Sequence, residues 1–195
     1  MKTIRVKING VSPILMNNPQ GVNPLHPLVI EKAKITSKRS KDKTEEDYAV
    51  ISDLEWRIGI YWDSNVGLYV PNECIMGTLV DGAKMNRNGS TVLKAVQVSE
   101  SIIPLDIGEQ QNYEKMLNDV RFRDVRSVVI NRSRVIKTRP RFNTWRCEFD
   151  MVYDESVIDV ATIALAFENA GKYCGLFDNR KNGYGRYTAN ITELN

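Results

Sequence analysis

The amino-acid sequence predicts an α+β fold in which helices cover one face of an antiparallel sheet. Segments with alternating polar and apolar residues, typical of half-buried strands, are interleaved with segments of helical periodicity. No Pro-, Gly- or Ser-rich linker separates two apolar cores, and a length of 195 residues suits one large domain. We therefore expect a single domain that spans residues 1–195.

The first quarter of the chain predicts one strand followed by irregular structure. Residues 3–9 alternate as a short strand, which Asn9-Gly10 ends as a turn. Residues 12–28 contain four prolines and are typical of a long loop. Residues 31–47 are polar, charged and weakly periodic, so we expect an exposed insertion there.

Three helices are indicated by capping residues and by apolar spacing. Thr44 and Asp47 form a predicted capping box at the start of the first helix. The second helix is expected from about Asn72 to Met85. Ser156 and Asp159 predict a capping box for the third.

The second half of the chain predicts most of the strands. Residues 142–153 show the cleanest alternation in the sequence, and residues 125–137 are rich in Val, Ile and Arg. We expect these two strands to form a long β-hairpin that turns at Arg139-Pro140-Arg141. Further strands are expected at residues 91–98, 101–105 and 187–192.

Basic residues are concentrated in one segment of a chain whose net charge is only +3. Residues 121–146 hold nine of the 27 Lys and Arg residues and one acid, Asp124, so this segment carries +8 and the remainder −5. With nothing else acidic nearby in the sequence, we expect a phosphate-binding surface; a solvated Arg-rich hairpin is the alternative. Eight of the nine are Arg, which binds phosphate bidentately and stacks on bases. The residues expected to contact nucleic acid here are Arg126, Arg132, Arg134, Lys137, Arg139 and Arg141.

An extended chain through this segment would distribute the cations over two faces. Arg132 and Arg134 would share one face, and Lys137, Arg139 and Arg141 would share the other. Among the nearby aromatic residues, Trp145 is either a core residue or a platform on which a base stacks.

A glycine-rich stretch from Gly175 to Arg186 is the sharpest local signal. It follows a predicted helix and precedes a strand, so it is not the strand-to-helix phosphate loop of nucleotide-binding folds. Its glycines let the backbone approach a ligand, unless they only make turns. The glycines are Gly175, Gly183 and Gly185, and the residues expected to hold a strand are Arg180, Lys181, Tyr184 and Arg186.

Residue types that support other classes of function are scarce. Three cysteines at wide spacing and one histidine, His26, predict neither a disulfide framework nor a zinc site. No apolar run approaches the ~20 residues of a membrane span, and the first residues lack the apolar stretch of a signal peptide. We expect a cytoplasmic protein with no catalytic residues, metal, cofactor or membrane partner.

The chain carries three motifs in order: Ser12-Pro13-Ile14-Leu15, residues 70–80, and Gly175 to Gly185. Together they resemble the RAMP superfamily of CRISPR-associated proteins, in particular the backbone subunits that line up along guide RNA. Ser12-Pro13-Ile14-Leu15 is similar to the family's Ser-Pro-apolar start. Residues 70–80 resemble its Ile-Pro-Gly-Ser-Ser-Leu-x-Gly segment, with Pro71 and Gly77 matching and Asn72 departing. Gly175 to Gly185 is similar to its C-terminal glycine-rich loop, although Phe177 and Asn179 depart from it.

The resemblance implies a fold, a partner and an assembly. It implies a ferredoxin-like (RRM-type) core with insertions at about residues 13–47 and 109–147, the second a thumb-like hairpin. It also implies a head-to-tail homo-oligomer along a strand. The chain is similar as well to small bacteriophage proteins, which would place it in a bacterial host cell.

The leading hypothesis is a non-catalytic protein that binds single-stranded RNA or DNA. One alternative is a RAMP-type endoribonuclease, for which His26 and Tyr184 would be the candidate residues. Another is a protein-interaction module, such as a phage inhibitor or assembly factor, that uses the Arg-rich hairpin against an acidic partner.

Overall fold

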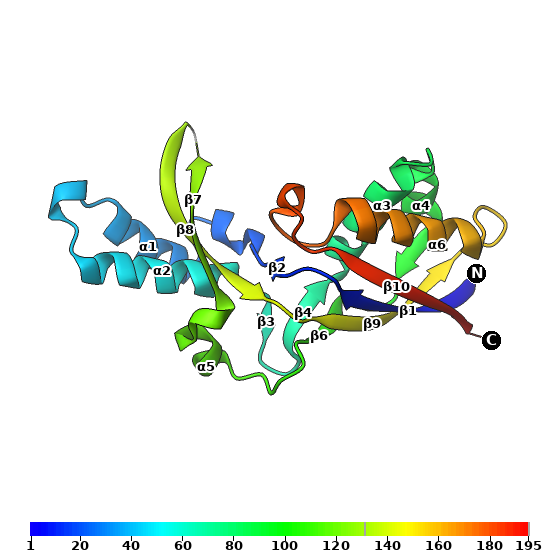
Figure 1. Cartoon of the computed structure of the whole chain (residues 1–195), viewed down its shortest axis with the longest axis horizontal. Coiled ribbons are helices and arrows are strands. Elements are labelled where there is room, and N and C mark those ends of the chain that lie inside the picture. The colour runs from blue at the N-terminus through cyan, green and yellow to red at the C-terminus, as the bar shows by residue number, and fades with distance from the viewer. Residues whose placement is uncertain (131, 195) are drawn as a thin grey trace. The chain divides into compact units, whose positions relative to one another are not determined.

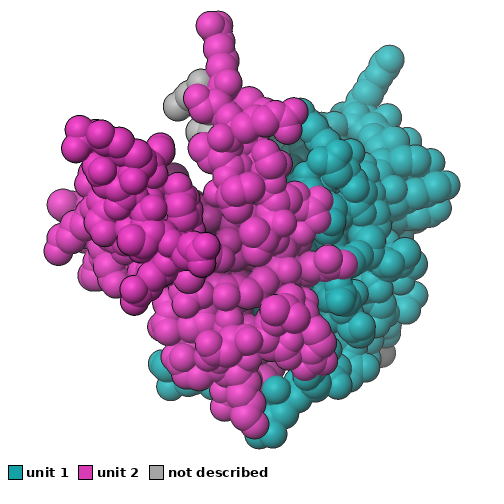
Figure 2. All heavy atoms as spheres, turned by 60° about the vertical axis from the view of Figure 1, so that its left-hand side comes forward, with its two compact units in different colours: residues 1–14, 62–110, 142–195 teal, residues 15–61, 111–141 magenta. Residues whose placement is uncertain are grey.

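The computed structural model describes residues 1–130 and 132–194 and has the predicted α+β composition, with six α-helices and antiparallel strands among these residues (Figure 1). The chain divides into two compact units, which Figure 2 colours separately. Unit 1 consists of Met1–Ile14, Trp62–Gln110 and Phe142–Asn195, and unit 2 of Leu15–Tyr61 and Gln111–Arg141. The expected single domain with two insertions stays a prediction.

Unit 1 is built on an antiparallel sheet with the strand order β10-β1-β9-β6-β4-β3, in which β5 also pairs with β9. Its strands are β1 (Lys2–Gly10), β3 (Trp62–Asp63), β4 (Gly67–Pro71), β5 (Val96–Val98), β6 (Ile102–Asp106), β9 (Arg146–Tyr153) and β10 (Tyr187–Leu194). Its helices are α3 (Asn72–Lys84), α4 (Gly89–Ala95), α6 (Val160–Asn169) and the short turns η4 (Ala170–Cys174) and η5 (Arg180–Asn182).

The core of unit 1 lies between this sheet and the helices α3 and α6, which lie on one of its faces (Figure 1). Every second residue of β1 is buried because its side chains alternate between the two faces. The two helices pack closely at Gly82, where an added Cβ would lie 2.2 Å from the Ala166 carbonyl oxygen. The opposite face of β1 and β9 is charged and carries Arg5, Lys7, Glu148 and Asp150.

Unit 2 combines helices with a small antiparallel sheet of order β2-β8-β7. Its helices are α1 (Pro27–Thr36), α2 (Glu45–Gly59), α5 (Tyr113–Asn118) and the short turns η1 (Pro19–Val22), η2 (Ser40–Asp42) and η3 (Val120–Phe122). The strands are β2 (Ile14–Leu15), β7 (Arg123–Ile130) and β8 (Ser133–Phe142), of which Ile14 and Phe142 belong to unit 1.

Helix α2 of unit 2 begins where the sequence predicts. The Thr44 hydroxyl accepts a hydrogen bond from the Asp47 amide, and the Asp47 carboxylate accepts one from the Thr44 amide, which confirms the capping box. At the other end of the helix, Trp56 is fully buried and its Nε1 donates to the Phe122 carbonyl over 2.8 Å. This bond ties α2 to the entry of the hairpin.

Three local expectations are wrong. Residues 27–36 form helix α1, although this part of the chain was expected to be loop and exposed insertion. Pro27 stands at the first helical position, where proline is favoured. Residues 89–95 form helix α4 and only 96–98 form a strand, instead of a strand over 91–98. Finally, Asp159 itself caps α6 by accepting from the Thr162 amide, whereas Ser156 bonds to Asp154.

Within the described part of the chain, no helix combines the length and apolar character that crossing a membrane requires.

Candidate nucleic-acid interface

The basic segment forms a β-hairpin in unit 2, but its turn is not where the sequence predicts. Strands β7 and β8 pair from Arg123↔Pro140 to Ile130↔Ser133, so the connection falls at residues 131–132. Arg132 has a φ of +66°, as two-residue hairpin turns require; Asn131 lies outside the described residues. The expected turn at residues 139–141 is therefore wrong, because Pro140 lies in β8, opposite the first residue of β7.

The strand expected to be the second arm of this hairpin belongs to unit 1 instead. Residues 146–153 form β9, which pairs with β1 along its whole length. Pro140 is tolerated in β8 because a missing amide hydrogen costs least at the end of a ladder. Its carbonyl still accepts a hydrogen bond from the Met16 amide at 2.9 Å.

Carboxylates neutralise much of the positive charge of residues 121–146. The expectation that no nearby acid would neutralise these cations is therefore wrong. At the base of the hairpin, Asp124 is only 4% exposed and pairs with both Arg126 and Arg139. Arg123 pairs with Asp53 of α2. Within the described residues, at least five of the nine basic residues have a carboxylate partner: Arg121, Arg123, Arg126, Arg139 and Arg146.

The far end of the hairpin carries cations that no carboxylate of the described residues neutralises. Arg132, in the turn, and Arg134, near the start of β8, are both exposed. Closer to the base, Lys137 Nζ donates to Asn17 Oδ1 at 2.9 Å, and Arg141 is half-buried. Lys137, Arg139 and Arg141 alternate along β8 and share a face as predicted, whereas Arg132 lies in the turn and not in an extended strand.

The glycine-rich loop of unit 1 is tightly folded. Gly175, Gly183 and Gly185 all have φ values between +72° and +82°, a region that favours glycine. A Cβ at Gly185 would lie 2.0 Å from the Leu176 carbonyl oxygen, whereas one at Gly183 would meet nothing within 4 Å. The glycines thus permit close backbone packing inside the protein at Gly185 and a turn at Gly183.

The three segments that carry the family resemblance lie together in unit 1, apart from Leu15, which belongs to unit 2. The Ser12 hydroxyl donates to the Gly183 carbonyl at 2.7 Å, and the Pro13 carbonyl accepts from the Gly185 amide at 2.8 Å. From helix α3, the Thr78 hydroxyl donates to the Gly175 carbonyl at 2.8 Å. The start of the chain and α3 therefore both hold the loop in place.

The cations of this loop are partly engaged by the protein itself. Arg180 Nη1 lies 3.1 Å from Asp81 Oδ2, and Arg186 Nη2 donates to the Arg180 carbonyl at 3.2 Å. The side chains of Lys84 and Arg180 hold the pKa of the Asp81 carboxyl below its ordinary value. Lys181 is exposed and Tyr184 is half-buried.

The aromatic residues near the basic segment belong to the core. Trp145 is 2% exposed and its Nε1 donates to the Ser12 carbonyl at 2.8 Å. Phe142 and Tyr153 are also buried. These three rings therefore pack inside the protein and do not offer a stacking platform.

The residues considered for catalysis or metal binding lie on different elements of the chain. The three cysteines are not joined by disulfides, and burial raises the pKa of the Cys147 thiol to about 12. His26 precedes α1 in unit 2, whereas Tyr184 belongs to unit 1. Among the described residues, no group of His, Cys, Asp or Glu could hold a metal ion.

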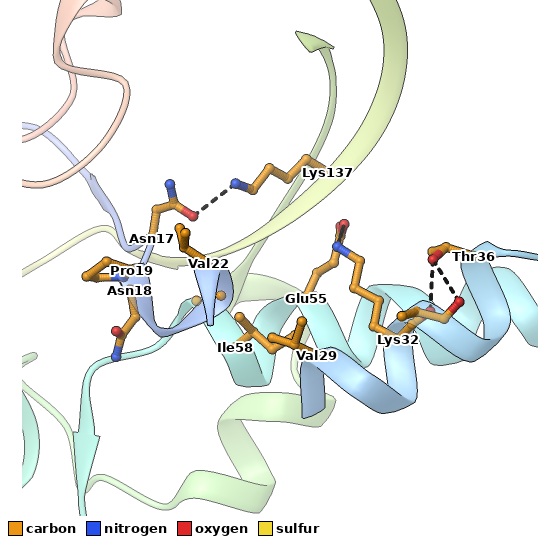
Figure 3. A pocket seen from close by; sticks show the side chains of 13 residues that line it. Asn17, Asn18, Pro19, Val22, Val29, Lys32, Thr36, Glu55, Ile58 and Lys137 are labelled. Atoms are coloured by element: carbon orange, nitrogen blue, oxygen red, sulfur yellow. Dashed lines mark hydrogen bonds and ion pairs between the residues drawn. The ribbon is translucent and has the colours of Figure 1, made fainter. Parts of the chain in front are cut away.

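A pocket of about 370 Å³ in unit 2 was missed by sequence reasoning (Figure 3). Glu55 of α2 lies on its wall, with Oε1 accepting from Lys32 Nζ at 2.6 Å and Oε2 from the Thr138 amide at 2.7 Å. The Asn17–Lys137 hydrogen bond lies on the other side of the pocket. Residues 29, 32, 33 and 36 line this pocket, and their helical spacing is the sequence signal that could have placed them on one face of α1.

Comparison with known proteins identifies the fold but no family. No protein-family model matches the chain, and no curated protein sequence matches it. The structure is similar to a chain of the Type III-B Cmr-beta bound to cognate target RNA, with a TM-score of 0.53 and 12% identity. This match covers 99% of our chain but only 60% of that one. A chain of a Type IV-B CRISPR complex matches with a TM-score of 0.38 and 11% identity, covering 97% of our chain and 90% of that chain.

Proposed function

We propose that this chain binds single-stranded RNA or DNA, without catalysing a reaction, through the β7–β8 hairpin. The observation that carries the proposal is the uneven distribution of charge along the hairpin. Carboxylates pair with its cations at the base, whereas Arg132 and Arg134 are exposed at the far end and have no carboxylate partner among the described residues. Such exposed guanidinium groups are suited to phosphate contacts.

The charge of unit 2 as a whole supports this assignment. Unit 2 carries 16 Lys and Arg residues against 10 Asp and Glu, whereas unit 1 carries 11 against 14. A net excess of positive charge on one unit attracts a polyanion and raises its association rate. The basic surface therefore belongs to unit 2, although the chain overall is only slightly basic.

The sheet of unit 1 is a poorer candidate. RRM domains bind RNA by stacking bases on aromatic residues of their sheet. Here the open face of β1 and β9 carries charged residues that pair with one another: Arg5 with Asp150 at 2.7 Å and Lys7 with Glu148 at 3.2 Å. We therefore assign the main contact to the hairpin, with Arg180, Lys181, Tyr184 and Arg186 of the glycine-rich loop as a second contact.

A RAMP-type role in a multi-subunit assembly is the context we propose. The fold shared with a chain of the RNA-bound Type III-B Cmr-beta supports it, as does the packing of the three family-like segments against one another. In this proposal the core is ferredoxin-like, and copies of the chain line up head to tail on one strand.

The test is binding of fluorescently labelled single- and double-stranded RNA and DNA at two salt concentrations. Changing Arg132 and Arg134 to Gln should weaken binding of single strands and reduce the log–log salt slope by about 1.4 units if each contacts one phosphate. The matched control changes Arg87 and Lys94 to Gln, two exposed cations of unit 1, and should leave the slope unchanged.

Three outcomes would contradict this proposal. If the hairpin variant binds as tightly as the wild type, the hairpin is not the interface. If labelled RNA is cut by the wild type but not by a His26→Ala variant, the endoribonuclease hypothesis replaces it. No binding to any oligonucleotide at low salt would favour a protein partner instead.

A further inference from the structure

The pocket of unit 2 is lined by apolar side chains and by about as many hydrogen-bonding side chains. We propose that this pocket holds one nucleobase of the bound single strand and so gives the protein a base preference. The inference rests on the proposed function, because it places the base of a strand whose backbone the hairpin contacts.

The size of the pocket suits one nucleotide. Its volume of about 370 Å³ lies near the lower end of the ~300–1,000 Å³ range of ligand sites. Val22 of η1, Val29 and Ala33 of α1 and Ile58 of α2 are among the lining residues, and the side chains of Val29 and Ile58 lie beside each other (Figure 3). Aliphatic walls of this kind cover the flat faces of a base at little desolvation cost.

The polar groups favour a base over a phosphate. Glu55 is a carboxylate whose side chain is only 10% exposed, and it would repel a phosphate placed beside it. A carboxylate offers about four lone-pair positions, of which Lys32 and the Thr138 amide occupy two. The remaining positions can accept N–H groups, and the Lys32 ammonium can donate to a ring nitrogen or carbonyl. Mixed donors and acceptors are what the edge of a base presents.

The position of the pocket links it to the proposed backbone contact. Lys137 on β8 lines the pocket and lies opposite Arg126 on β7, so the two cations share one face of the hairpin. Because Asp124 already pairs with Arg126, Lys137 is the cation that would hold a phosphate here, and the attached base would lie within reach of the pocket. All these residues belong to unit 2.

Filling the pocket without removing a charge provides the test. Ala33 is exposed on α1 and lines the pocket, so Ala33→Phe should block it. Ile30, on the same helix and 41% exposed, is not a lining residue, so Ile30→Phe adds a ring to α1 outside the pocket as the matched control. Binding of equally long single-stranded RNAs of A, C, U and G-containing sequence is measured by fluorescence anisotropy at two salt concentrations.

The expected result separates base recognition from backbone contact. The wild type should prefer one RNA, and Ala33→Phe should weaken binding of that RNA by about tenfold, which corresponds to about 1.4 kcal/mol. The salt slope should stay the same, because no phosphate contact is lost. Ile30→Phe should behave as the wild type. If Ala33→Phe does not fold, Val22→Phe, at a residue 84% exposed, takes its place.

Each contrary result is distinct. If RNAs bind but without base preference, or if the filled variant keeps the wild-type preference, the pocket inference is wrong and the proposed function stands. The same holds if Ile30→Phe has the effect of Ala33→Phe. If no oligonucleotide binds the wild type, the proposed function fails and the inference fails with it.

Discussion

Arg5 and Asp150 lie directly opposite each other in the β1–β9 register, and the guanidinium donates to both carboxylate oxygens, at 2.7 Å and 2.9 Å. The Arg5 hydrogen bond is the main reason that the pKa of Asp150 is held below its ordinary value. A carboxyl whose pKa is lower in the folded state stabilises the protein fully above its unfolded pKa, about 4. This contribution is lost as the pH falls through the lower, folded value.

We therefore expect Arg5→Gln to lower the urea midpoint slightly at neutral pH, since exposed pairs contribute little. Its deficit relative to the wild type should vanish in acid, once Asp150 is protonated in both proteins. Urea titrations followed by circular dichroism at several pH values would measure this, with Lys94→Gln as the exposed control. A deficit that persists in strong acid would mean that Arg5 acts through packing and not through Asp150.

Gly185 and Gly183 allow a second test, because both have positive φ but only one is crowded. Gly185→Ala places a Cβ against the Leu176 backbone and should cost about 3 kcal/mol or more of unfolding free energy. Gly183→Ala meets no atom within 4 Å, so it should cost only the ~1–2 kcal/mol of the left-handed conformation. Equal losses in chemical denaturation would show that the loop relaxes around Gly185.

A substitution at Trp145 would test whether this aromatic residue stabilises the fold or stacks on a base. Its Nε1 donates to the Ser12 carbonyl, and Gly10 lies so close that an added Cβ would be 2.3 Å from this nitrogen. Trp145→Phe leaves that carbonyl without its donor and should lower the unfolding free energy by about 1–3 kcal/mol. Affinity for single-stranded RNA should not change. A loss of affinity without a loss of stability would instead make Trp145 a stacking residue.

Much of the framework of unit 1 could be predicted because its signals are local. The alternation along residues 146–153 marks β9, and the first strand and helix α3 follow equally clear patterns. The capping box of Thr44 and Asp47 likewise located the start of α2. In each case the residues that decide the structure lie within one element.

The errors arose where distant residues decide the structure. Helix α1 has no fully buried residue, and Lys32 gains a partner only because Glu55 of α2 lies beside it. Pro140 suggested a turn, but the pairing of β8 with β7 and the bond from Met16 to its carbonyl keep it in a strand. The pocket was missed for the same reason, since its walls come from η1, α1, α2 and β8.

The sequence alone also could not reveal every carboxylate that neutralises the cations of residues 121–146. Asp53 precedes its partner Arg123 by 70 positions and comes to it only through the packing of α2. A net charge counted along a segment therefore overstates the charge that a ligand meets. Among the described residues of the hairpin, Arg132 and Arg134 are exposed and have no carboxylate partner, which is why the proposed contact is placed there.

Asp124 provides the last prediction, because it pairs with two arginines of unequal burial. The side chain of Arg126 is 38% exposed and that of Arg139 only 11% exposed. Asp124→Asn removes the negative charge beside both, so Arg139, which is only 11% exposed, loses this ion pair and stability should fall by about 3 kcal/mol. Arg126 becomes available to a phosphate, so affinity for single strands should rise and the salt slope should steepen by about one unit.

The two effects of Asp124→Asn have opposite signs, which distinguishes them from a general loss of folding. Asp119→Asn is the matched control, because its partner Arg121 is exposed and stability should hardly change. Thermal melts and binding at two salt concentrations measure both quantities on the same samples. A drop in stability with an unchanged salt slope would remove Arg126 from the interface and leave the far end of the hairpin as the contact, because Arg132 and Arg134 do not depend on Asp124.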